Sequence, residues 1–310
     1  MEDYPRTLPE LERRFSTEED CRQYLFALRW PEGFVCPRCG GRKAWCMTRG
    51  LWLCGQCRRQ TSVTAGTIFQ DSRLALTLWF RAMWYVSSQK NGVSAMGVQR
   101  VLGFGSYQTA WAWLHKLRRA MVRPGRQRLG GRIEVDETYI GGRESAPGRG
   151  AVSKSLVVVA AQEAGAGIGR VRLACIPAAS QAVLGAFVAG AIEPGSTIHT
   201  DGWSGYDLLV SQGYGHEVTK LKGKPANAAV VLLPRVHRVA SLLQRWLLGT
   251  HQGAVSAEHL AYYLDEFTFR FNRRTAKSRG KLFYRLVQQA VQVTPQPYQS
   301  LIRPQPLVDG

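Results

Sequence analysis

Residues 133–142 read Ile-Glu-Val-Asp-Glu-Thr-Tyr-Ile-Gly-Gly and mark the point where the chain changes from helical to strand periodicity. Apolar and polar side chains alternate here, as in a half-buried strand, and the two glycines end the pattern. The elements expected after it are strands at 155–161, 169–176, 196–201 and 216–220, and helices at 180–192, at 205–212 and after His237. This order predicts an α/β fold with a mixed sheet and flanking helices.

Two aspartates end up on neighbouring strands of that predicted sheet. Asp136 lies in the first strand, and Asp201 ends the fourth in the stretch His-Thr-Asp-Gly-Trp at 199–203. Either aspartate alone is explained equally well as a turn or cap residue. As a pair, however, they are typical of a site for Mg²⁺, which prefers carboxylate oxygens. Two such ions about 4 Å apart stabilise both the attacking and the leaving oxygen of a phosphoryl transfer.

Four cysteines upstream form two Cys-x2-Cys pairs. Cys36 and Cys39 make the first pair and Cys54 and Cys57 the second, with fourteen residues between the pairs. Each pair directs two thiolates at one point, and two pairs complete the tetrahedral coordination of Zn²⁺. A redox dithiol is the alternative, but the doubled spacing favours zinc. Because four ligands fill the coordination shell, we expect a structural zinc ribbon, with a short hairpin at 45–53.

The remaining N-terminal sequence has helical periodicity, beginning with a helix from Thr17 to about Leu28. After the cysteines, apolar residues recur at helical spacing in 74–88, 92–101 and 106–121, and Leu-Gly-Phe-Gly separates the last two. A short helix, a glycine turn and a basic helix are typical of a helix-turn-helix that binds DNA. The alternative is a helix that packs in a core while its cations are solvated. Its candidate DNA contacts are Lys116, Arg118 and Arg119.

The charge of the chain also indicates a polyanionic partner. Its 310 residues include 41 Lys and Arg against 22 Asp and Glu, a formal net charge of +19. Cations at this density bind DNA phosphates through counterion release, and basic residues gather at 143–154, 220–224 and 270–285. No run approaches the ~20 apolar residues of a membrane span, and the first residues are too polar for a secretory signal. We therefore expect a cytoplasmic, nucleoid-associated protein with double-stranded DNA as its partner.

Four stretches together resemble ISXO-type insertion-sequence transposases, and the resemblance covers about residues 15–290. They are Val-Asp-Glu-Thr-Tyr-Ile-Gly-Gly at 135–142, His-Thr-Asp-Gly-Trp at 199–203, the segment from His237 through Leu-Gly-Thr-His at 248–251, and Tyr-Leu-Asp-Glu-Phe-Thr-Phe-Arg-Phe-Asn-Arg-Arg at 263–274. The resemblance implies a DDE-type catalytic domain with a ribonuclease-H-like fold. It also implies metal-dependent cleavage of transposon ends and strand transfer to target DNA, by a homodimer or larger oligomer.

The same resemblance assigns the third catalytic ligand to an unusual residue. The family places it about 35 residues after the second, usually as Glu, and here that position is His237. A neutral imidazole would favour Mn²⁺ over Mg²⁺ more than a carboxylate does, or it could act in proton transfer. Glu258 is the alternative ligand. The family's lysine seven positions further on is Gln244 here, so we expect the adjacent Arg245 to contact DNA, together with Arg273 and Arg274.

These patterns predict five segments. They are an N-terminal helical segment (1–33), a zinc ribbon (34–66), a helix-turn-helix-like segment (67–123), a catalytic domain (130–290) and a C-terminal tail (291–310). The leading hypothesis is a transposase with catalytic Asp136, Asp201 and His237, using structural Zn²⁺ and catalytic Mg²⁺ or Mn²⁺. The alternatives are a catalytically silent DNA-binding regulator and a nuclease of the same fold.

Overall fold

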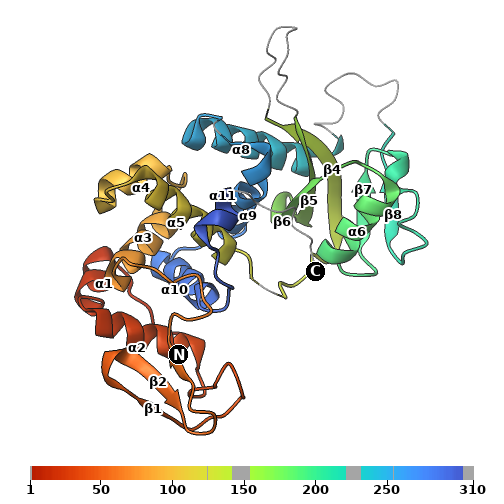
Figure 1. The fold of residues 1–310 in the computed structure, drawn as a ribbon. Helices are drawn as coiled ribbons and strands as arrows, with labels where there is room; N and C mark the ends of the chain where they lie inside the picture. Colours follow the sequence, from red (N-terminus) through yellow and green to blue (C-terminus); the bar gives the residue numbers. More distant parts are fainter. Residues whose placement is uncertain (1, 124, 142–153, 221–231, 254, 303–310) are drawn as a thin grey trace. The chain divides into compact units, whose positions relative to one another are not determined.

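The computed structural model describes residues 2–123, 125–141, 154–220, 232–253 and 255–302. The chain divides into two compact units (Figure 1). The N-terminal unit joins residues 1–123 to residues 275–310, and the sheet unit is formed by Pro124–Arg274. Within the described ranges, no helix combines the length and the apolar character needed to cross a bilayer. Gly142 and most of the basic stretches 143–154 and 220–224 lie outside the described residues.

The cysteine-rich part of the N-terminal unit is a small antiparallel sheet. Its strands are β1 (Ala44–Cys46), β2 (Leu51–Cys54) and β3 (Gln60–Ser62), in the order β1-β2-β3. A 3-10 turn at Thr48–Gly50 joins β1 to β2, with Arg49 and Gly50 both at positive φ. The hairpin predicted at 45–53 is therefore present, and β3 extends it to the three strands of a zinc ribbon.

Helices make up the rest of the N-terminal unit. Thr17 caps the second of them: its hydroxyl accepts from the Asp20 N–H while the Asp20 carboxylate accepts from the Thr17 N–H, a complete capping box. The helix at 8–14 was not among the sequence predictions. The helices are α1 (Leu8–Arg14), α2 (Glu18–Arg29), α3 (Leu76–Ser88), α4 (Ala95–Leu102), α5 (Tyr107–Ala120), α10 (Arg279–Ala290) and α11 (Tyr298–Ile302).

Aromatic packing places α10 in this unit, which corrects the predicted domain boundary at residue 290. The ring of Phe283 on α10 is fully buried, 5.6 Å from the ring of Phe80 and 5.9 Å from that of Trp84, both on α3. The spacing along the sequence carried no sign of this long-range contact. The sheet unit consequently ends at Arg274, and the predicted catalytic segment of 130–290 was too long by one helix.

The sheet unit contains the mixed sheet predicted from residues 133–142. Its strands are β4 (Arg132–Ile140), β5 (Ser155–Ala164), β6 (Gly167–Ile176), β7 (Thr197–Thr200) and β8 (Gly215–Val218), in the order β6-β5-β4-β7-β8 (Figure 1). The β4-β5 and β5-β6 pairs are antiparallel, while β4-β7 and β7-β8 are parallel. The first and fourth strands are thus neighbours at the centre, as the ribonuclease-H-like order requires.

Helices cover both faces of this sheet. On one face, α8 (Pro234–His251) and α9 (Leu260–Phe271) bury Val157, Val159 and Leu173. On the other face, α6 (Gln181–Ala191) packs with Val135, Val158 and Ile198. The helix expected at 205–212 is instead a single 3-10 turn (Ser204–Tyr206) followed by turns, which end at Gly213 with a φ of 86°.

Candidate metal centres

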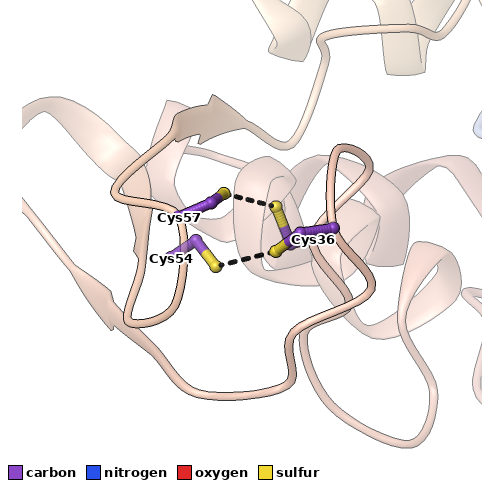
Figure 2. A group of neighbouring side chains, drawn as sticks. Cys36, Cys54 and Cys57 are labelled. Atoms are coloured by element: carbon purple, nitrogen blue, oxygen red, sulfur yellow. Dashed lines mark hydrogen bonds between the residues drawn. The ribbon is translucent and has the colours of Figure 1, made fainter.

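The four cysteines predicted to bind zinc converge between two loops of the ribbon. Their sulfur atoms all lie within 4.8 Å of one another. The Sγ atoms of Cys36 and Cys57 are 3.6 Å apart, as are those of Cys39 and Cys54. Figure 2 shows Cys54 and Cys57 on one loop facing Cys36 on the opposite loop. Sulfurs at about 2.3 Å from a tetrahedral zinc would be about 3.8 Å apart, so these residues fit the ion.

The two loops that carry the cysteines have the same backbone form. Gly40 donates its N–H to the Cys36 carbonyl at 2.9 Å, and Arg58 donates to the Cys54 carbonyl at 3.0 Å. Both donors have positive φ, 73° and 60°. The pKa of Cys54 lies below that of an ordinary thiol, chiefly because the Cys57 N–H donates to its sulfur. The backbone therefore favours the thiolate form that zinc requires.

In the sheet unit, strand register brings the two aspartates level with each other. In the parallel β4-β7 pair, Glu134 lies opposite His199. Asp136 lies two residues after Glu134 on β4, and Asp201 lies two residues after His199, just beyond the end of β7. Neighbouring strands lie about 4.8 Å apart. Beyond β7 the chain turns at Gly202, whose φ is 85°, and a side chain there would collide with Val218. The Asp201 carboxylate accepts the Trp203 N–H at 3.0 Å, which holds it in this turn.

A buried glutamate on β4 places the helix that carries His237. Glu134 is 1% exposed, and its Oε2 accepts the backbone N–H of Arg235 at 2.7 Å and of Val236 at 3.0 Å. These are two of the free donors in the first turn of α8, whose own cap residue, Leu233, offers no side-chain bond. The other oxygen of Glu134 accepts from the Arg235 guanidinium at 2.8 Å. A strand residue therefore caps α8 and neutralises its first cation.

This cap brings His237 to the carboxylate of Asp136. The side chains of Glu134 and Asp136 point to the same face of β4, the face covered by α8, because the two residues are two positions apart on the strand. His237 Nε2 lies 3.4 Å from Asp136 Oδ2 and makes no hydrogen bond within the described part of the chain, although the atom is buried. A buried polar atom without a partner is costly. Its position beside a carboxylate is what a divalent cation bound between the two would require.

Burial sets the ionisation of the acids around this point. It raises the pKa of Asp136 to about 6, and the charge of Asp201 adds to the shift. Glu137, on the opposite face of β4, has its pKa raised to about 7 by burial, although the Tyr206 hydroxyl donates to it. Burial also lowers the pKa of His237, against the charges of Glu134 and Asp201. Near neutral pH, the imidazole is uncharged and can donate a lone pair to a metal.

The residues present fit a divalent cation at Asp136 and His237, with Asp201 less closely placed. Among the described residues, only the four cysteines bring three or more potential ligand atoms within 4.8 Å of one another. The Asp201 oxygen that accepts from Trp203 is turned into its own loop. Completing a three-residue site therefore needs a rotation of the Asp201 side chain, which the intermediate burial of this residue allows.

Comparison with known proteins addresses the same two regions of the chain. Residues 128–272 match the ISXO2-like transposase domain, and residues 16–60 match the transposase zinc-ribbon domain. This confirms the resemblance to ISXO-type insertion-sequence transposases. The chain is also 29% identical, over 292 residues, to an uncharacterized protein in transposable element ISH50 of Halobacterium salinarum. That alignment covers 87% of this chain and 95% of the relative.

The other side chains predicted to contact DNA differ in their exposure to solvent. Arg245 is exposed on α8. However, Gln244 and not Arg245 lies on the same side of the helix as His237, because it is seven residues, about two helical turns, further along. Arg118 on α5 is only 2% exposed. A buried guanidinium cannot reach a phosphate, so the assignment of Arg118 to DNA does not hold in this structure. Lys116 and Arg119, on the same helix, are half-buried.

Of the two arginines that follow α9, Arg274 contacts the free edge of the sheet and Arg273 packs against a ring of α9 itself. Asn272 pairs with both backbone groups of Val171 on β6, and Arg274 donates to the carbonyls of Ile168 and Gly169. These contacts cover the free edge of β6, which would otherwise pair with another strand. Arg273 packs its guanidinium 4.1 Å from the centre of the Phe269 ring. Glu258 is exposed in a 3-10 turn (Ala257–His259) before α9.

Sequence reasoning missed Glu134, although the sequence contained a signal. Residues 133–140 place Glu134 on the same face as Asp136, and a carboxylate at that position of a buried strand needs a partner. The partner, the backbone of Arg235 and Val236, is about a hundred residues away and has no local pattern. The missed role of Glu134 is therefore to position α8, and with it His237.

Proposed function

We propose that this chain is an active DDE-type transposase, which cleaves transposon ends and joins them to target DNA by metal-dependent phosphoryl transfer. The observation that supports this most is the approach of His237 Nε2 to Asp136 Oδ2, next to the strand that leads to Asp201. A catalytically silent descendant would need neither a neutral imidazole nor a carboxylate at this point. The transposase domains found in both units are consistent with the proposal.

In this proposal, three side chains hold the reacting phosphate through divalent ions. Mg²⁺ or Mn²⁺ would supply positive charge to the attacking, leaving and non-bridging oxygens. Asp136 and Asp201 would bind as carboxylates from adjacent strands. His237 would bind through Nε2, which requires its proton on Nδ1. The cap that Glu134 provides would keep the imidazole beside Asp136.

An assay with labelled transposon ends tests the proposal. The full-length, zinc-loaded chain is incubated with Mg²⁺ or Mn²⁺ and with duplexes carrying the inverted repeats that flank its reading frame. Joined products support a transposase, cut products alone indicate a nuclease, and bound but intact DNA indicates a regulator. Asp136→Asn should abolish both products while DNA binding persists. An active Asp136→Asn variant would show that the catalytic site lies elsewhere.

A further inference from the structure

Arg172 is a buried cation on β6 whose hydrogen bonds go to backbone carbonyls. It is 5% exposed and donates to the carbonyls of Val171 at 3.0 Å and Gln127 at 2.6 Å. In the described part of the chain, no carboxylate forms an ion pair with it. Carbonyl oxygens satisfy the N–H groups but supply no counter-charge. The site therefore carries an uncompensated positive charge under its surface.

Further arginines surround this charge. Arg170, two residues earlier on the same side of β6, donates to the Arg128 carbonyl at 3.1 Å, so its guanidinium lies against the same segment. Arg126 is exposed at the start of that segment. Burial, and then the charges of Arg126, Arg170 and Arg273, lower the pKa of Arg172 to about 10. The guanidinium remains charged at neutral pH, in spite of repulsion from its neighbours.

Elsewhere in the sheet unit, a comparably placed arginine does have a counter-charge. Arg270 on α9 is 12% exposed at its side chain and donates to the fully buried carboxylate of Glu266 at 2.7 Å. Arg172 and Arg270 both lie in the sheet unit, and they differ in that, within the described residues, only Arg270 has a carboxylate partner. A cluster of arginines that lacks such an acid is poorly stabilised alone, and gains most when an external anion binds.

We propose that Arg126 and Arg170 form a phosphate-binding site for the DNA backbone, with Arg172 supplying charge from beneath them. The inference rests on the proposed function only in taking DNA as the polyanion. A diester of the DNA backbone suits the site better than a free phosphate, because residues 125–128 are all exposed and offer an open surface. Contacts of this kind hold the duplex in place without reading its sequence.

The direct contacts are tested by measuring how DNA affinity depends on salt. Arg126→Gln combined with Arg170→Gln is compared with wild type on two unrelated duplexes. We expect about tenfold weaker binding to both, and a log-log salt dependence that is shallower by about 0.9 for each phosphate that the variant no longer binds. Unchanged affinity and slope would overturn the proposal.

Inorganic phosphate provides a second test of the same site. If it protects wild type against thermal unfolding at millimolar concentration as strongly as DNA does, the site binds free phosphate and not the backbone.

Arg172 itself gives a test in which stability and binding change in opposite directions. Arg172→Met should weaken DNA binding several-fold while the unfolding midpoint stays level or rises, because an unpaired buried charge is removed. The matched control is Arg270→Met, which strands Glu266 and should lower the midpoint without changing the salt slope. If Arg172→Met lowers the midpoint and leaves binding intact, Arg172 only anchors Gln127. None of these measurements uses strand transfer, so they stand even if the transposition assay fails.

Discussion

The carboxylate of Glu134 accepts the backbone N–H of Val236 across 102 residues of sequence and so joins the central strand to the start of α8. Through this bond, the strand that carries Asp136 also sets the position of His237, one residue after Val236. The second bond, from the Arg235 N–H, and the ion pair with the Arg235 guanidinium make the link three-fold. The helix begins with Pro234, a residue suited to a first turn, but it has no side-chain cap of its own, and Glu134 supplies that cap from the strand.

Removing this carboxylate should uncouple α8 from the sheet. Glu134→Ala leaves the backbone N–H groups of Arg235 and Val236 without their acceptor and removes one of the two carboxylates that pair with the Arg235 guanidinium. We expect the sheet unit to lose about 3 kcal/mol or more of stability. The matched control is Glu163→Gln, because Glu163 also pairs with Arg235 at 3.2 Å but touches no backbone group of α8. Urea unfolding of the two variants measures the effect. Equal losses in both variants would contradict the role given to the cap.

The buried acids predict a stability that falls as the pH rises. The pKa of Asp136 is raised to about 6 and that of Glu137 to about 7, so the folded protein holds protons that the unfolded chain releases. The stabilisation is complete below the ordinary pKa of these acids, near 4, and is lost as the pH rises through 6 to 7. For Asp136 alone, the rise in pKa corresponds to at most roughly 3 kcal/mol. Thermal unfolding without divalent metal, at pH 5 and pH 7.5, measures this loss.

Divalent metal should reverse this loss at high pH. Mg²⁺ or Mn²⁺ needs the deprotonated carboxylates, so either ion should raise the unfolding midpoint more at pH 7.5 than at pH 5. Asp136→Asn should be more stable than wild type at pH 7.5 without metal, and should respond less to the ions. If the variant responds to Mn²⁺ as wild type does, Asp136 is not a ligand.

The sheet and the ribbon could be predicted because their signals are local. Alternation and the glycines at 141–142 define the central strand, and the doubled Cys-x2-Cys spacing defines the ribbon. The spacing from Asp201 also led to His237, whose imidazole does lie against Asp136. Once the strand order was predicted, the adjacency of the two aspartates followed from it.

The parts that sequence could not supply depend on contacts between distant segments. The burial of Phe283 against α3 moved the last long helix out of the sheet unit, and no pattern within 279–290 distinguishes one partner from the other. Charge alone was equally uninformative for DNA contacts. Arg118 lies in a basic run yet is buried, and Arg274 holds the edge of β6. Only the fold separates a solvated arginine from a structural one.

Loss of zinc should unfold the ribbon and leave the sheet unit folded. Cys54→Ser removes a buried ligand, so we expect the ribbon to lose its zinc ion and its protease resistance. The matched control is Cys46→Ser, because Cys46 is exposed on β1 and lies outside the group of four. Zinc content by atomic absorption, with limited proteolysis, measures both variants. Zinc retained by Cys54→Ser, or lost from Cys46→Ser, would contradict the assignment.

Substitutions at His237 should separate a ligand from a structural residue. His237→Ala removes the lone pair 3.4 Å from Asp136, and we expect strand transfer to fall by about a hundredfold or more. His237→Glu restores an oxygen ligand, so activity should recover and shift from Mn²⁺ towards Mg²⁺, since harder ligands favour the harder ion. The rates of strand transfer in each metal, compared between the three proteins, measure this shift.

Two other outcomes have distinct meanings. If His237→Ala is as active as wild type, the third ligand lies elsewhere, and Glu258→Gln then becomes the variant to test. If both His237 variants are inactive in every metal but bind DNA normally, the imidazole acts in proton transfer, because a carboxylate can replace it as a ligand.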